Sequence, residues 1–140
     1  MTSRLILVPG LIMLAACTTA AEQPEIPGCR TMECVAIGES QQVFADFRVT
    51  PLEVLEDSRC PIEADCIWEG QVRLRAQLDL GHESIEAELN SSKPMRINGG
   101  FLSVAEVAPE ASVQWSPIEA NDYRFGFSFA PDVMENQIAG

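Results

Sequence analysis

The cysteines are the residues whose type and spacing could do chemistry in this sequence of 140 residues. Four of the five form two close pairs, Cys29 with Cys34 and Cys60 with Cys66. Neither pair has the C-x-x-C spacing of zinc ligands or thiol redox centres, and the sequence holds a single histidine. Metal binding and thiol redox chemistry at these cysteines are therefore disfavoured.

Disulfides are the remaining chemistry for these four residues, because an even number of cysteines in an exported chain predicts pairing. Each close pair encloses a short local loop, which favours the disulfides Cys29–Cys34 and Cys60–Cys66. Loops of this length contribute roughly 2–3 kcal/mol each on the chain-entropy account. A cross-link from one member of the first pair to one member of the second is the alternative.

The N-terminus predicts that the chain is exported. Arg4 precedes an apolar run of about ten residues, whereas a membrane-spanning helix needs roughly twenty. Leu14-Ala15-Ala16-Cys17 then resembles the lipobox of bacterial lipoprotein precursors. The resemblance implies a signal peptide over residues 1–16, cleavage before Cys17 and acylation of that cysteine. The acyl chains would anchor the protein, since each buried methylene contributes about 0.8 kcal/mol.

Thr18 bears on which membrane holds the anchor. A threonine directly after the cysteine resembles the sorting context that sends Gram-negative lipoproteins to the outer membrane. We therefore expect a protein of the bacterial cell envelope, lipid-anchored through Cys17 to the outer membrane and facing the periplasm. An ordinary secretory signal, cleaved near Thr19-Ala20-Ala21 and discarding Cys17, is the alternative.

The net charge of −12 restricts the partners of the chain. Nucleic acid is excluded as a natural partner because phosphate binding needs clustered lysines and arginines. The acidic excess also argues against docking of the domain on anionic lipids. No nucleotide fingerprint or P-loop is present, so we expect no cofactor.

Apolar and polar residues alternate along several segments, which predicts strands with one buried face. Residues 71–80 and 84–89 form the strongest pair, a hairpin with Gly81-His82 at its turn. Further strands are expected over 41–49, 52–56, 101–107 and 123–129, with Pro51 separating the first two. We predict an all-β fold: a single small antiparallel β-sandwich or partly open barrel of six to seven strands.

This pattern divides the chain into four parts. The signal peptide covers residues 1–16, and residues 17–40 comprise the lipidated cysteine, a flexible tether and a loop closed by the first disulfide. The β-sandwich domain covers 41–130, and a flexible C-terminus covers 131–140.

The segment from Asp57 to Gly70 has the densest run of unusual residues. Its pattern D-S-R-C-P…C-x-W-x-G resembles a motif of small exported bacterial domains without an assigned activity. Arg59 and Trp68 are the candidate binding residues. In the scaffold interpretation, Trp68 packs over the Cys60–Cys66 disulfide or closes the end of the sandwich, and Arg59 pairs with Asp57 or Glu69, or donates to loop carbonyls. In the alternative, the loop is a protein-docking or protease-inhibitor-like loop with Arg59 exposed.

We expect a non-catalytic binding or interaction module that holds an envelope protein or a small ligand. An enzyme is disfavoured because His82 falls in a predicted turn beside Glu83, away from any nucleophile. Two classes remain as weaker alternatives. One is a hydrolase based on the carboxylates of Glu63, Asp65 and Glu69, and the other is a periplasmic metal-handling protein using Met32, Met95, Met134 and His82.

Overall fold

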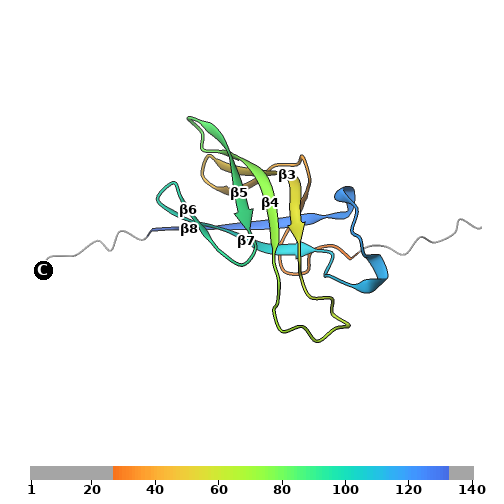
Figure 1. Ribbon diagram of the computed structural model, residues 1–140. Coiled ribbons are helices and arrows are strands. Elements are labelled where there is room, and N and C mark those ends of the chain that lie inside the picture. The colour runs from red at the N-terminus through yellow and green to blue at the C-terminus, as the bar shows by residue number, and fades with distance from the viewer. Residues whose placement is uncertain (1–26, 133–140) are drawn as a thin grey trace, which may run out of the picture.

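The computed structural model describes residues 27–132 as two four-stranded antiparallel sheets (Figure 1). The first sheet has the strand order β1 (Val35–Ala36), β8 (Arg124–Pro131), β7 (Gly100–Ala108), β6 (Met95–Ile97). The second has the order β2 (Gln41–Phe44), β3 (Phe47–Asp57), β4 (Val72–Asp79), β5 (Ser84–Asn90). The predicted all-β, sandwich-like class is confirmed. The predicted signal peptide, Cys17 and residues 133–140 lie outside the described range.

Helical structure in the described range is limited to two 3-10 turns, η1 (Val113–Trp115) and η2 (Ala120–Asp122). No helix within residues 27–132 is long and apolar enough to cross a membrane.

The structure has eight strands where six to seven were expected. The unexpected strand is β1, which falls in the segment 17–40 that was expected to be tether and loop, and two further boundaries were misplaced without changing the count. The segment 41–49 is a tight hairpin, with Phe44 paired to Phe47 across a two-residue turn at Ala45 and Asp46. Because the turn contains two residues, buried and exposed positions continue to alternate through it, and the sequence pattern predicts a single strand. Pro51 does not end a strand. The β2–β3 pairing stops at Val49, so the missing N–H of Pro51 interrupts no further pairing on that side.

The core lies between the two sheets and follows the predicted alternation. The second sheet contributes alternate residues of β3 and β4, and the first contributes β7 and β8; the fully buried members are Phe47, Val49, Val72, Leu74, Ala76, Leu78, Leu102, Phe125 and Phe127. The predicted hairpin is present as β4 and β5, with Leu74 opposite Leu89. The aromatic stripe of β8 is therefore core.

Both predicted disulfides are present, Cys29–Cys34 and Cys60–Cys66. The first closes a loop that precedes β1 and packs on the first sheet. A Cβ on Gly126 of β8 would lie 2.4 Å from Met32 Sδ and 3.0 Å from Cys34 Sγ. The loop can therefore pack on β8 only where position 126 has no side chain. The loop therefore fixes the N-terminal end of the domain against β8.

Candidate functional site

The connection between β3 and β4 projects from one end of the two sheets (Figure 1). Residues 60–70 are called the stapled loop here, because they contain the Cys60–Cys66 disulfide. Its base extends the β3–β4 ladder: Ser58 N donates to Gln71 O at 2.9 Å, and Cys60 N donates to Glu69 O at 3.0 Å. Gly70 has φ +71°, and a Cβ there would lie 1.8 Å from Ser58 O. These hydrogen bonds close the base of the loop, and they can form only because position 70 is a glycine.

A second set of contacts joins the stapled loop to the segment around η1. Ile62 N donates to Ala111 O at 2.9 Å, and the Glu63 carboxylate accepts from Ser112 Oγ and from Val113 N. The hydrogen bond from Ser112 lowers the pKa of Glu63. The loop is therefore held at its base, by its disulfide and along one side.

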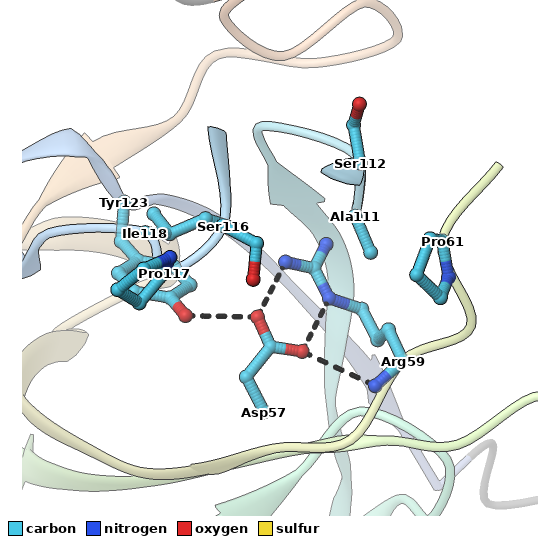
Figure 2. Close-up of a pocket in the computed structure, with 9 residues that line it drawn as sticks. All are labelled: Asp57, Arg59, Pro61, Ala111, Ser112, Ser116, Pro117, Ile118 and Tyr123. Atoms are coloured by element: carbon cyan, nitrogen blue, oxygen red, sulfur yellow. Dashed lines mark hydrogen bonds and ion pairs between the residues drawn. The ribbon is translucent and has the colours of Figure 1, made fainter. Parts of the chain in front are cut away.

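Arg59 lies at the neck of the stapled loop (Figure 2). Its Nε and Nη2 donate to the two carboxylate oxygens of Asp57 at 2.9 and 2.7 Å, and its Nη1 donates to Pro109 O at 2.9 Å and Val107 O at 3.3 Å. The Tyr123 hydroxyl donates to the same carboxylate at 2.8 Å. The side chains of Asp57 and Arg59 are each only 16% exposed. The predicted Arg59–Asp57 pairing is confirmed, and it fastens the loop to the end of β7.

Burial and hydrogen bonding act in opposite directions on this cluster. Burial by itself would raise the pKa of Asp57, but the hydrogen bonds from Arg59 and Tyr123 outweigh it and hold the pKa below its ordinary value. Burial, reinforced by the Asp57 carboxylate, raises the pKa of the Tyr123 phenol. Both shifts move the groups away from neutral pH, where a general acid or base must titrate. The cluster is suited to structure rather than proton transfer.

This arrangement predicts a specific acid sensitivity. A carboxyl group whose pKa is lower in the folded state stabilises the fold above its unfolded pKa, and that stability is lost as the pH falls through the folded value. We expect Asp57→Asn to lower the free energy of unfolding at pH 7 and to flatten its decline below about pH 4. Urea unfolding between pH 7 and 2.5 measures both effects, with Asp65→Asn as the exposed control. An unchanged acid slope in Asp57→Asn would contradict this assignment.

The scaffold interpretation is wrong for Trp68. Its side chain is 81% exposed and that of Ile67 is 92% exposed, so Trp68 neither covers the disulfide nor closes the sandwich. The end of the sandwich beside the loop is instead occupied by Arg59, Asp57 and Tyr123 (Figure 2). The two apolar side chains of the loop are therefore left in solvent.

Exposed apolar side chains gather at this end of the domain. Among the large aliphatic and aromatic residues of the described range, the four most exposed all lie in the stapled loop or in η1; these are Ile62, Ile67, Trp68 and Val113. We call these four residues the apolar tip. Exposed apolar groups concentrated on neighbouring segments are typical of an interaction surface. Of these four residues the sequence predicted only Trp68 as a binding residue. Ile62 and Ile67 were missed although they lie in the same loop, and Val113 was missed because no local pattern links η1 to the loop.

A cavity of about 190 Å³ lies beside Arg59 (Figure 2). It is lined by Asp57, Tyr123, Ser112 and neighbouring prolines. Within residues 27–132, every buried side-chain nitrogen or oxygen has a hydrogen-bond partner. No buried polar side-chain atom of this cavity is left waiting for a ligand, so the observed hydrogen bonds support a structural role for the Arg59 cluster.

The residues of the metal-handling alternative lie on separate elements, whereas the three carboxylates of the hydrolase alternative share the stapled loop. His82 is in the β4–β5 turn, with Nε2 3.4 Å from Glu83. Met32 packs against Gly126, Met95 begins β6, and Met134 lies outside the described residues. Of the three loop carboxylates, Glu63 is tied to Ser112 and Val113, whereas Asp65 and Glu69 are exposed.

Cys29, Cys34 and Glu106 bring potential ligand atoms within 4.8 Å of one another. The two sulfurs are bonded to each other, so they are not thiolate ligands. The Glu106 carboxylate accepts from the backbone N–H groups of Arg30 at 2.5 Å and Thr31 at 3.1 Å. The group therefore fastens the N-terminal loop to β7.

Comparison with known proteins finds no match: no family model, curated protein or solved structure resembles the chain closely enough to be counted. The resemblances to the lipobox and to the D-S-R-C-P motif therefore remain predictions. The function has to be argued from the site itself.

Proposed function

We propose that this chain is a lipid-anchored envelope protein whose β-sandwich domain is a non-catalytic binding module. It docks on a protein partner through the apolar tip of the stapled loop. The observation that carries the proposal is the exposure of Ile67 and Trp68, 92% and 81%, on a loop fixed by a disulfide and by the Arg59–Asp57 pair.

Rigidity and exposure together favour binding. A fixed loop loses little conformational entropy when it is buried in an interface. Tryptophan is the residue type most often found at binding hot spots, because its large apolar surface is desolvated on association. The loop therefore offers a pre-organised anchor for a partner. The exposed Trp68 does not stabilise the isolated domain, so its place on the loop is better explained by binding.

The geometry favours a general docking loop over a protease inhibitor that presents Arg59. An inhibitory residue must enter the protease pocket as an accessible side chain, whereas the Arg59 guanidinium is bound to Asp57 and to two backbone carbonyls. The residues offered to a partner are Ile67 and Trp68. Arg59 is a positioning residue for them.

The anchor is proposed from the sequence, with Cys17 as the acylated residue. We expect Cys17→Ala to move the protein from the membrane fraction to the soluble periplasmic fraction, because no acyl chain then holds it. Fractionation measures this, and mass spectrometry of the wild-type protein should show an acylated N-terminal cysteine. A wild-type mature N-terminus without acyl groups would overturn the anchor.

Site-specific photo-crosslinking tests the docking loop. Benzoylphenylalanine in place of Ile67 should form an adduct with another envelope component in intact cells, since the side chain is then buried in the partner. The same group in place of Ile85, an exposed position of β5, is the matched control. Absence of an adduct at position 67, or an identical adduct at position 85, would reject the proposed function.

A further inference from the structure

We infer that the docking partner is a protein embedded in the same membrane as the lipid anchor, and that it presents an apolar pocket bordered by lysine or arginine side chains. The inference rests on the proposed function and deepens it. Two independent features of the structure carry it: the place where the tether joins the domain, and the charge around the apolar tip.

The tether joins the domain at the end that carries the apolar tip. Ile62 lines a cavity of about 220 Å³ together with Pro27, the first described residue, and Gly28. Arg30 fixes this segment, since its N–H donates to Glu106 and its guanidinium lies 3.3 Å from Glu110. In Figure 1 the described chain starts near η1 and ends far from it, beyond β8.

The length of the tether limits how far this end can move from the membrane. Pro27 lies ten positions after Cys17, and a fully extended chain over that interval spans at most about 36 Å. The tether therefore keeps the end of the domain that carries Pro27 and Ile62 within reach of proteins in the anchoring membrane. A partner in that membrane benefits from a local concentration that a freely diffusing periplasmic protein lacks.

The charge around the apolar tip indicates which charge the partner surface carries. The stapled loop carries Glu63, Asp65 and Glu69 but no lysine or arginine of its own, and the adjacent Arg59 is already paired with Asp57. Asp65 and Glu69 are both exposed, so their carboxylates border the apolar tip in solvent. An apolar centre with an acidic border is complementary to an apolar pocket with a basic border.

The same charges argue against lipid as the docking surface. Insertion of Ile67 and Trp68 between headgroups would bring the carboxylates of Asp65 and Glu69 against lipid phosphates without a basic side chain to offset the repulsion. A protein pocket can supply those cations at fixed positions. The observations therefore favour a membrane protein over the bilayer itself.

The test uses the full lipid-anchored chain with benzoylphenylalanine in place of Ile67, and identifies the adduct by mass spectrometry. We expect an integral membrane protein, crosslinked at a segment with lysine or arginine beside apolar residues. The double variant Asp65→Lys, Glu69→Lys should lower the adduct yield at least about 10-fold. A control with the same charge change, Asp46→Lys, Glu83→Lys, should leave the yield unchanged.

The outcomes separate the inference from the proposed function. An adduct with a soluble periplasmic protein, or a yield that charge reversal leaves unchanged, would overturn the inference while the docking loop stands. An adduct with lipid alone would reject docking on a protein and the inference with it. No adduct at all would reject the docking loop and the inference with it. Adding Cys17→Ala should lower the yield by about 10–100-fold, because the local concentration is lost; an unchanged yield would contradict a partner in the same membrane.

Discussion

Replacement of Arg59 by alanine is expected to lower the free energy of unfolding by about 3–5 kcal/mol. The variant leaves the Asp57 carboxylate largely buried, with the Tyr123 hydroxyl as its remaining side-chain donor. It also frees the carbonyls of Val107 and Pro109. Urea unfolding of the purified protein at pH 7 measures the loss.

The control for this prediction is Arg30→Ala. Arg30 also forms an ion pair, 3.3 Å from Glu110, but its side chain is 69% exposed. Solvent screening limits such a pair to roughly 1 kcal/mol or less. Equal losses in the Arg30 and Arg59 variants would show that the neck of the stapled loop is not held by the buried pair.

Replacement of Trp68 by alanine is expected to act on binding and to spare folding. Loss of an anchoring tryptophan should cost about 2 kcal/mol or more of binding free energy, which is about a 30-fold loss of affinity. The free energy of unfolding should stay within about 0.5 kcal/mol of the wild-type value, since the side chain is 81% exposed. Titration of labelled, soluble Cys17→Ala protein onto isolated envelope membranes measures the affinity.

Leu55→Ala is the matched control for Trp68→Ala, because Leu55 is an exposed apolar residue of β3 outside the stapled loop. It should leave the affinity unchanged. An affinity loss shared by both variants would point to general surface hydrophobicity. A large stability loss in Trp68→Ala would show that the tryptophan packs in the fold.

The parts of the fold that the sequence predicted depend on local pattern. Alternation along β4 and β5 identifies a hairpin because burial on one face of a sheet repeats every second residue. The disulfides were predictable because each joins cysteines only five or six positions apart. The hairpin turn at Ala45 was missed because a two-residue turn leaves the alternation intact.

The candidate site was harder to predict because it depends on contacts between distant segments. Tyr123 and Asp57 are 66 positions apart, and Glu63 and Ser112 are 49 apart. No local pattern predicts these pairs. The burial of Trp68 was wrongly expected for the same reason, because its environment depends on whether Arg59 and Tyr123 already fill the end of the sandwich.

Fluorescence of Trp68 tests the central claim most directly. The Trp115→Phe variant leaves Trp68 as the sole tryptophan, because the sequence contains two. The purified variant should emit at the long wavelength of a water-exposed indole, and the emission should shift to shorter wavelength when isolated envelope membranes are added. A short-wavelength emission from the purified protein, unchanged by membranes, would show that Trp68 is a packing residue of the fold.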